Sequence, residues 1–389
     1  MTLEKKSLDA PQPIGNRFDR MEWAGAFGDL GTLVPFVVAY IAVLGVDPFG
    51  VLFAFGVSLV VCGFYYKTPF PVQPMKAIGA VATTQAAQTA TITAGAVYAA
   101  SLVTGLIWLV LGLTGLTKRV TDLISRPVAI GIVLGLGIGF MIEGSKLMAS
   151  GWILSVGLLL LTLLLLTNRI IPVMFLLLIG GAAVAMFRDP QLLTALGAVK
   201  IDARLPTFAL SDLRWTDLVV GVAFLALPQV PLTLGNAVVA ITEENNRLFP
   251  DRPVTERGVS ISTGVMNLFG SAVGGVPMCH GAGGMAGHVR FGARTGGSSI
   301  ILGGVLLLLA VFLSGSVQTI FAVIPREVLG VILFLTGAQL ALGSCDFSKD
   351  KGERFTTVVT AGLSVWNIGL AFVLGLAIYH LLKRKLIRL

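Results

Sequence analysis

The sequence predicts an all-α protein that crosses a membrane many times, and its composition and the spacing of its charges support this prediction. Of 389 residues, 55% are hydrophobic and only 12% are charged, whereas a soluble domain carries about 25% charged residues. The charges are clustered, so that no Asp, Glu, Lys or Arg occurs from Ala77 to Thr117. Uncharged runs of this length fit helical crossings of about 20 residues. They do not fit the alternating segments of about ten residues that form transmembrane barrels.

Apolar runs and the breakers between them divide the chain into expected spans, seven on each side of a polar linker. These fourteen spans are 23–43, 49–66, 71–91, 94–116, 127–142, 151–167, 170–187, 217–241, 258–276, 277–293, 297–314, 320–343, 355–366 and 367–384. We therefore expect a cytoplasmic tail at 1–20, a first transmembrane repeat at 21–187, an extracytoplasmic linker at 188–215 and a second transmembrane repeat at 216–389. The last two spans are short, and we expect them to turn near Trp366 and Asn367.

The distribution of Lys and Arg predicts the orientation in the membrane. With a cytoplasmic N-terminus, 21 of the 28 Lys and Arg residues fall in cytoplasmic segments, six fall outside, and Lys76 is the remaining one. This asymmetry follows the positive-inside rule. It predicts a multi-pass protein of the plasma (inner) membrane with both termini cytoplasmic. It also accounts for the net charge of +8 without a nucleic-acid partner. The first 20 residues lack the apolar core of a signal peptide, so no cleaved signal is expected.

Seven spans in each half would make the second half enter the membrane from the opposite side. Two halves related in this way form an inverted repeat. Weak internal similarity supports this hypothesis, because two sets of matching residues have almost the same separation along the chain. The sets are Pro74 and Met75 with Pro277 and Met278, and Gly131 with Gly330.

Two segments in corresponding places of the halves are poor helices. In the third span, Pro69, Pro71 and Pro74 lack amide N–H groups and push the residues before them into extended conformations. In the tenth span, Pro277 stands among glycines. We expect the third span to enter the membrane extended and to become helical only near Lys76. Paired interrupted segments are the best pointer in a sequence to the binding site of a transporter.

Such a pair favours an anionic ligand. The N-terminus of each half-helix offers unpaired N–H groups and a partial positive charge of about +0.5. Lys76 adds a full positive charge beside one of them. Three roles for Lys76 remain open: contact with an anion, directly or through water; an ion pair with Asp29; or a side chain that reaches the interface. Asp29 is either the counter-charge of Lys76 or a carboxylate that couples transport to protons.

Several neutral polar residues accompany these charges. His280 lies one position beyond the residue that matches Lys76, and we weigh a ligand or proton-relay role against a structural one. Gln73, Gln229 and Asn236 are able to donate to oxyanion oxygens, and interhelical hydrogen bonding is an equally good interpretation of each.

Enzymatic, metal and cofactor functions find no support in the sequence. The three cysteines, Cys62, Cys279 and Cys345, are an odd and scattered set, which argues against a disulfide framework or a metal site. HGAGG is similar to an esterase oxyanion loop, but no GxSxG motif accompanies it. We expect no enzymatic activity, no cofactor and no bound metal.

At these residues the chain resembles the molybdate transporters that are distantly related to the sulfate-permease (SulP) anion carriers. The resemblance extends over essentially the whole chain and rests on FGDLGTLVPF (27–36), PFPVQPMKAI (69–78), PQVPLTLGNAVVA (228–240) and MNLFGSAVGGVPMCHGAGGMAGHVRFGARTGGS (266–298). It implies two inverted seven-span repeats, with a core domain (spans 1–4 and 8–11) and a gate domain (spans 5–7 and 12–14). The third and tenth segments would each be a short strand followed by a half-helix. No C-terminal regulatory domain is expected after Leu382.

The resemblance also implies a substrate and a site. The expected substrate is molybdate, with tungstate or sulfate as overlapping oxyanions. Carried over, the substrate-binding site falls near Gln73, Lys76 and Ala77 and near Cys279, His280 and Gly281. Gln229 is added to these candidates because its side chain is able to donate to an oxyanion. The expected mechanism is alternating access. Protons are the candidate coupling ion and a homodimer is a candidate assembly. The alternatives are a sulfate or other inorganic-anion transporter of the same fold, an anion channel and a nucleobase carrier.

Overall fold

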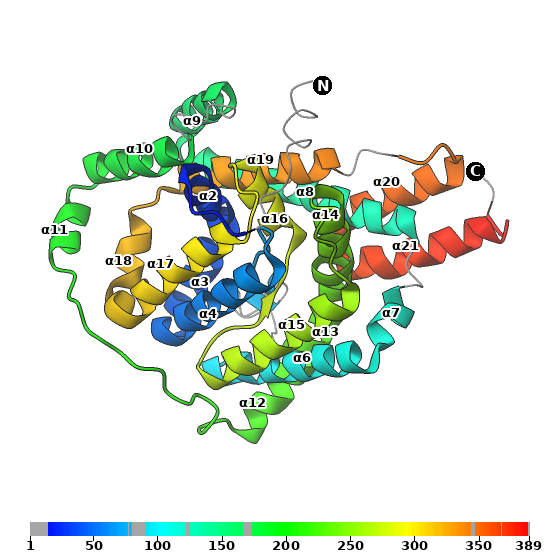
Figure 1. Ribbon diagram of the computed structural model, residues 1–389, viewed down its shortest axis with the longest axis horizontal. Helices are drawn as coiled ribbons and strands as arrows, with labels where there is room; N and C mark the ends of the chain where they lie inside the picture. Colours follow the sequence, from blue (N-terminus) through cyan, green and yellow to red (C-terminus); the bar gives the residue numbers. More distant parts are fainter. Residues whose placement is uncertain are drawn as a thin grey trace.

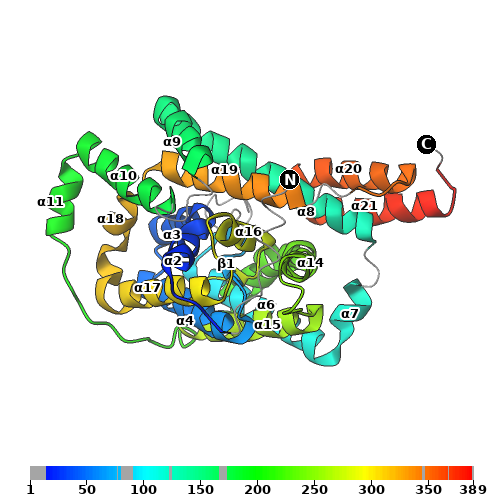
Figure 2. The ribbon, with the colours of Figure 1, turned by 45° about the horizontal axis from the view of Figure 1, so that its top comes forward.

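The structure is a computed structural model that describes residues 15–387 except 77, 80–90, 122–124, 166–172, 344–346 and 367. In this part of the chain it is a bundle of helices around one two-stranded sheet (Figures 1 and 2). The first half contains α2 (Arg20–Ala26), η1 (Phe27–Asp29), α3 (Leu30–Leu44), α4 (Pro48–Tyr66), β1 (Gln73–Pro74), α6 (Ala94–Thr114), α7 (Leu116–Thr121), α8 (Arg126–Met148), η2 (Ala149–Gly151), α9 (Trp152–Leu165) and α10 (Val173–Arg188).

The second half begins after a linker that contains α11 (Gln191–Gly197). It contains α12 (Trp215–Val220), η3 (Gly221–Ala226), α13 (Leu227–Leu232), η4 (Thr233–Ala240), α14 (Ile241–Leu248), α15 (Glu256–Ala272), β2 (Met278–Cys279), α16 (Ala282–Arg290), α17 (Gly297–Leu313), η5 (Ser314–Ser316), α18 (Val317–Ala322), α19 (Arg326–Gly343), α20 (Lys351–Trp366) and α21 (Ile368–Lys383).

The helices are those of a multi-pass membrane protein. Among the described residues, four helices are long and apolar enough to cross a membrane, or up to six if two bent pairs each count as one span. Large apolar side chains also stand on the outer surface, for example Leu164 and Ile179, which are 79% and 70% exposed. A soluble protein rarely leaves such surfaces uncovered, whereas lipid covers them in a bilayer.

The structure describes the boundary between the fifth and sixth expected spans and the boundary between the last two. We expected 127–142 and 151–167 to be separate, but one 3-10 turn (η2) joins α8 to α9, so that the segment between them is helical. At the other end of the chain, α20 and α21 are separate helices that lie side by side (Figures 1 and 2). This agrees with the expected turn near Trp366; Asn367 lies outside the described residues.

Residues 215–248 form one unbroken run of helical elements that includes two π-helical stretches, η3 and η4. Pro228 and Pro231 lie between these stretches and contribute no amide N–H, so the regular hydrogen-bond ladder of an α-helix is interrupted here. The wider π turns accommodate the interruption, and such turns occur frequently at functional sites. All eight residues of η4 are buried.

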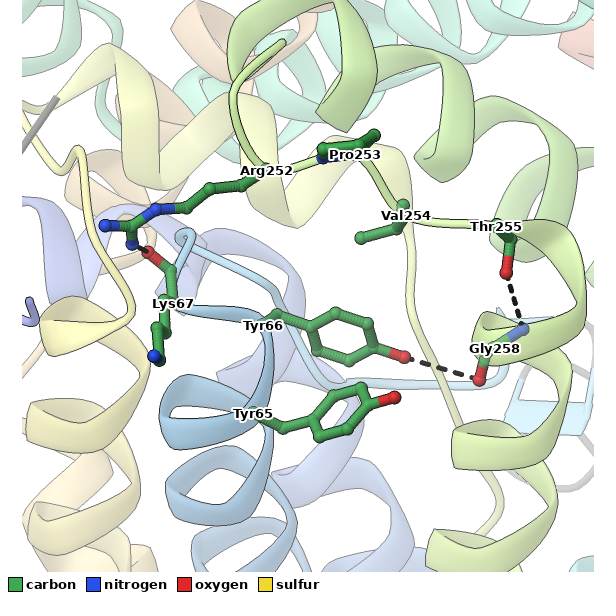
Figure 3. A pocket seen from close by; sticks show the side chains of 8 residues that line it. All are labelled: Tyr65, Tyr66, Lys67, Arg252, Pro253, Val254, Thr255 and Gly258. Atoms are coloured by element: carbon green, nitrogen blue, oxygen red, sulfur yellow. Dashed lines mark hydrogen bonds between the residues drawn. The ribbon is translucent and has the colours of Figure 1, made fainter. Parts of the chain in front are cut away.

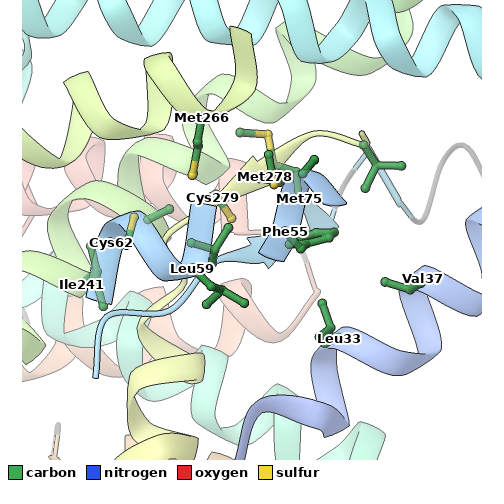
Figure 4. Packing of buried hydrophobic residues seen from close by; sticks show 14 of the residues in the cluster. Leu33, Val37, Phe55, Leu59, Cys62, Met75, Ile241, Met266, Met278 and Cys279 are labelled. Atoms are coloured by element: carbon green, nitrogen blue, oxygen red, sulfur yellow. The ribbon is translucent and has the colours of Figure 1, made fainter. Parts of the chain in front are cut away.

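The elements pack in pairs drawn from the two halves. Helix α4 packs on α17, α6 packs on α15, and α8 packs on both α19 and α20. The sheet lies inside this bundle, where side chains of α3, α4 and α15 surround it: Leu33, Phe55 and Met266 are among the buried residues next to Met75 and Met278 (Figure 4).

Some contacts between elements are backbone to backbone. A Cβ on Gly28 would lie 2.6 Å from the carbonyl carbon of Gly287, and a Cβ on Gly287 would lie 3.0 Å from that of Gly28. Only residues without side chains permit this approach of η1 to α16. The two glycines therefore bring Asp29, the last residue of η1, close to the start of α16.

The linker is attached to the bundle along its length (Figure 1). The guanidinium of Arg204 donates to both carboxylate oxygens of Asp47 at 3.0 Å. The amides of Asp202 and Arg204 donate to the carbonyls of Phe312 and Val311 at the end of α17.

A buried carboxylate fixes the entry to α17. Glu22 is 1% exposed, and its oxygens accept hydrogen bonds from the amides of Arg294, Thr295 and Ser298 at 2.9, 2.9 and 3.2 Å. The side chain therefore caps the N-terminus of α17 from α2, as an acidic group near a helix start is expected to do.

Replacing this carboxylate should destabilise the protein. In Glu22→Gln, one amide oxygen replaces two charged oxygens, and the new NH2 group faces backbone donors. A hydrogen bond to a charged group contributes about 1.5–3 kcal/mol, so we expect a lower melting temperature of the purified protein in detergent. Glu143→Gln is the matched control, because Glu143 forms an exposed ion pair with Lys146 and such pairs contribute little. Equal melting temperatures for the two variants would contradict the capping role.

Candidate functional site

The site is built on the two short strands. Gln73 pairs with Cys279 and Pro74 with Met278 in an antiparallel ladder, and the amide of Met75 donates to the carbonyl of Pro277 at 2.8 Å. The expected strand in each broken segment is therefore present. The prolines explain why these residues are extended, since they cannot join an α-helix interior.

A helix follows each strand. Lys76, Ile78 and Gly79 are helical, and the amide of Gly79 donates to the carbonyl of Met75 at 2.9 Å. In the other segment, Gly281 precedes α16, whose nine residues are Ala282–Arg290. Because the strands are antiparallel, these helices begin at opposite ends of the ladder, with only the strands between their N-terminal ends.

Asn267 of α15 completes the outer edge of β2. Its Oδ1 accepts from the amide of Met278 at 2.8 Å, and its Nδ2 donates to the carbonyl of the same residue at 2.6 Å. The side chain thus supplies the donor and the acceptor that a third strand would have supplied. Non-helical backbone inside a membrane protein requires such partners.

His280 is held by both of its ring nitrogens. Nδ1 lies 2.8 Å from the carbonyl oxygen of Pro71, which only accepts, so Nδ1 carries the proton. Nε2 lies 2.8 Å from Oγ of Ser262 and accepts from this hydroxyl, which in turn lies 2.6 Å from the hydroxyl of Tyr66. The ring therefore ties the segment before β1 to α15, which is the structural alternative among those considered for His280.

Lys76 differs from every other charge near the strands. Its ammonium nitrogen is buried and has no hydrogen-bond partner among the described residues, and it lies 3.8 Å from the centroid of the Phe140 ring. Within that part of the chain it forms no salt bridge with Asp29, although the two charges interact electrostatically. A cation–π contact stabilises an ammonium by about 0.5–2 kcal/mol without neutralising it. The full charge of Lys76 thus remains available to an anion.

Asp29 has other partners. Its Oδ1 accepts from Nε2 of Gln73 at 2.5 Å and from the hydroxyl of Thr32. Because an ionised carboxylate only accepts, the NH2 group of Gln73 must point toward Asp29. Oε1 of Gln73 then points the other way and has no partner among the described residues; a Cβ on Gly281 would collide with it.

Gln229 and Asn236 approach the two helix starts from α13 and η4. Oε1 of Gln229 accepts from the amide of Ile78 at 3.2 Å, and its Nε2 donates to Thr233 at 3.0 Å. Gln229 therefore satisfies one amide in the first turn after Lys76. Nδ2 of Asn236 lies 3.7 Å from where a Cβ of Gly281 would be, and its buried Oδ1 has no partner in the described part of the chain.

The remaining expected residues are placed as follows. Cys279 is 3% exposed within the apolar cluster around β2. Gly281 and Gly284 allow α16 to approach the polar side chains, because a Cβ on Gly284 would lie 2.8 Å from Oδ2 of Asp29 and 2.9 Å from Nε2 of Gln73. Ala77 and Cys345 lie outside the described residues. The described residues contain no group of three or more His, Cys, Asp or Glu side chains that could hold a metal ion.

Three residues of this site were missed in the sequence. Asn267 lies on α15, the helix that precedes β2, and Phe140 lies on the distant helix α8; nothing in their own segments indicates the contacts that they make with the broken segments. His288 of α16 is fully buried, donates from Nδ1 to the carbonyl of Gly25 at 2.8 Å and interacts electrostatically with Asp29. Its Nε2 has no partner among the described residues. A second histidine in the block 266–298 was the available signal.

Taken together, the site has one buried, unpaired cation beside a helix start, a second helix start across the strands, and a carboxylate that is held apart by Gln73 and Thr32. Helix N-termini and a desolvated ammonium bind anions. The arrangement suits reversible binding of a small anion.

Comparison with known proteins identifies relatives of the whole chain. Residues 21–140 and 221–340 match the family described as "Molybdate transporter of MFS superfamily". Molybdate transporter 2 of Arabidopsis thaliana is 32% identical over 419 residues, which cover 94% of this chain and 87% of that protein. Molybdate transporter 1 of the same plant is 31% identical over 405 residues, which cover 92% and 87%.

Solved structures show the same fold at low sequence identity. The transmembrane domain of the cyanobacterial bicarbonate transporter BicA matches with a TM-score of 0.52 and 18% identity, over 93% of this chain and 100% of that one. The murine anion transporter Slc26a9, in its inward-facing state, matches with a TM-score of 0.58 and 13% identity, over 100% of this chain and 73% of that one. The chain thus has the fold of these anion carriers, and it belongs to the molybdate transporter family, whose members are membrane transport proteins and not enzymes.

Proposed function

We propose that this protein transports a tetrahedral oxyanion, molybdate in the first place, by alternating access. The observation that carries the proposal is the buried ammonium of Lys76, which has no anionic partner among the described residues and stands where a helix begins. The related Arabidopsis proteins, which are named molybdate transporters, support the choice of oxyanion.

The architecture that we propose has fourteen spans in two inverted repeats. The repeats are residues 21–187 and 216–389, with the tail 1–20 and the linker 188–215. Two observations support it. The family match falls on two stretches of equal length that begin at residues 21 and 221. The packing is also symmetric, because exchanging the halves converts the pair α4–α17 into the pair α15–α6 and maps β1–β2 and α8–α19 onto themselves.

In this architecture, Lys76 and α16 belong to the core domain, whereas Phe140 on α8 belongs to the gate domain. The Phe140 ring contacts the ammonium of Lys76, and a Cβ on Gly283 would collide with the same ring. Phe140 therefore lies against both broken segments from the gate side. Relative motion of core and gate would open this contact and expose the anion to one side of the membrane.

The hydrogen bonds of Asp29 support coupling to protons. Entry of a dianion against a negative-inside potential costs about 2.3 kcal/mol per charge per 100 mV, so accumulation needs a driving ion. While Asp29 is ionised, it holds the NH2 group of Gln73 and leaves Oε1, an acceptor, toward Gly281. A protonated Asp29 would donate to Oε1 instead. The Gln73 amide would then turn, and its NH2 group would become available to the anion.

The alternatives make different demands on the site. Sulfate is also a tetrahedral dianion, and the geometry of the site does not separate it from molybdate. A channel would pass anions without saturation at low concentration. A nucleobase carrier would be stabilised against heat by uracil and not by oxyanions. A thermal-shift comparison of molybdate, tungstate, sulfate, bicarbonate and uracil separates these functions.

Removal of the Lys76 charge should abolish tight binding. In Lys76→Gln, the anion loses a charge-assisted hydrogen bond of about 1.5–3 kcal/mol, so the Kd for molybdate measured by calorimetry should rise roughly 10- to 100-fold. Lys146→Gln is the control, because Lys146 is exposed and paired with Glu143; its Kd should not change. An unchanged Kd in a folded Lys76→Gln variant would reduce Lys76 to a structural role.

Proton coupling should depend on Asp29. In proteoliposomes, molybdate accumulation should increase when the outside is made more acidic than the inside, since the proton gradient then drives entry. Asp29→Asn resembles the protonated carboxyl at every pH, so this variant should equilibrate molybdate without responding to the gradient. The readout is the amount of molybdenum inside the vesicles, measured by mass spectrometry. Equal accumulation by the unmodified protein with and without the gradient would refute coupling.

A further inference from the structure

A cavity of about 450 Å³ lies away from the strands, where α4 ends and α15 begins (Figure 3). Tyr65, Tyr66 and Lys67 line it from α4, Arg252 lines it from the loop that follows α14, and Thr255 and Gly258 line it at the start of α15. Its volume is within the range of small-molecule sites. None of the expected substrate-binding residues that the structure describes lines it, so we treat it as separate from the proposed anion site at Lys76.

The cavity is electropositive. Of the described residues that line it, Lys67 and Arg252 are charged, and none is Asp or Glu. The guanidinium of Arg252 donates to the main-chain carbonyl of Lys67, which places the two basic residues on the same side of the cavity (Figure 3). The opposite wall is the first turn of the 17-residue helix α15, which contains Glu256 and whose Gly258 carbonyl accepts from the hydroxyl of Tyr66. The ligand that complements these groups carries a negative charge.

The cavity is continuous with an apolar outer surface. Val61, Phe64 and Tyr65 of α4 are 58%, 59% and 71% exposed, and their spacing places them on one face of the last turns of the helix. Aromatic residues at the end of an apolar helix are typical of the boundary between acyl chains and headgroups. A ligand in the cavity therefore has lipid-like surroundings on one side and basic groups on the other.

We propose that this cavity binds the headgroup of an anionic phospholipid, with the phosphate between Lys67, Arg252 and the start of α15 and the acyl chains along Val61 and Phe64. Both demands, charge complementarity and an adjacent apolar face, are met by a lipid and not by free phosphate. Basic groups next to membrane helices attract anionic lipids in this way.

The floor of the cavity is rigid. The ring of Tyr66 stacks on Phe70 with centroids 3.7 Å apart, and its hydroxyl bonds to Ser262, which bonds to His280. The chain of hydrogen bonds ends on the carbonyl of Pro71. A preformed cavity loses less conformational entropy when a ligand binds.

The test uses the full-length protein in a neutral detergent, and the probes are dioctanoyl phosphatidylglycerol, dioctanoyl phosphatidylcholine and inorganic phosphate at equal concentrations. Phosphatidylglycerol should raise the melting temperature by at least about 3 °C, because a ligand that binds only the folded state stabilises it. The other two probes should not raise it. The double variant Lys67→Gln, Arg252→Gln should lose the rise. Lys349→Gln, Lys351→Gln, which removes two exposed lysines outside the cavity, should keep it.

The single variant Lys67→Gln provides a second measurement, since Arg252 still reaches the main-chain carbonyl of residue 67; it should lose at least half of the rise. An equal rise with phosphatidylcholine, or an unchanged rise in the double variant, would overturn the proposal. An equal rise with inorganic phosphate would assign the cavity to a soluble anion and overturn it as well. The double variant should bind molybdate normally, so the result is independent of the transport site.

Discussion

The structure depends on one constraint: main chain that is not helical has to find all of its hydrogen-bond partners within the protein, because lipid offers none. The four prolines of the two broken segments prevent a helix and create this demand. The two-residue ladder meets part of it, and side chains of α15, of α13 and of the second broken segment itself meet more of it. Asn267 pairs with the outer edge of β2, Gln229 accepts from the amide of Ile78, and His280 donates to Pro71.

The same constraint explains why the polar residues are arranged as they are. His280 and Gln229 form hydrogen bonds to the main chain, and in this they differ from Lys76. Among the described residues, the ammonium of Lys76 is a buried cation held only by an aromatic ring. Asp29, in contrast, accepts hydrogen bonds from Thr32 and Gln73 at Oδ1. A cation without a partner among the described residues and a carboxylate kept apart from it form the site that we propose for the anion.

The sequence predicted the parts of this arrangement that are local. Prolines and glycines in the third and tenth segments indicated extended backbone followed by helices, and the isolated position of Lys76 indicated an unusual charge. The turn between α20 and α21 followed from the basic residues at both ends of the apolar run, which a single span would have placed on opposite sides of the membrane. What the sequence could not reveal depends on contacts between distant segments. Phe140 reaches Lys76 from α8, which is far away in the sequence. The π-helical stretches depend on how the helix that contains Pro228 and Pro231 packs. The helical junction of α8 and α9 was also missed, because a polar stretch looks the same whether it forms a loop or an exposed helical turn.

The close approach of η1 to α16 has a consequence for how this family can vary. Gly28 and Gly287 allow η1 and α16 to approach closely because neither has a Cβ atom. The position of the Asp29 carboxylate therefore depends on two residues that have no side chain. Variation at these positions is restricted by backbone proximity and not by chemistry. Relatives with a different substrate can exchange the polar residues that contact that substrate. A larger residue in place of either glycine would collide with backbone atoms. Over evolutionary time the most constant positions near the site would then be ones that never contact the anion.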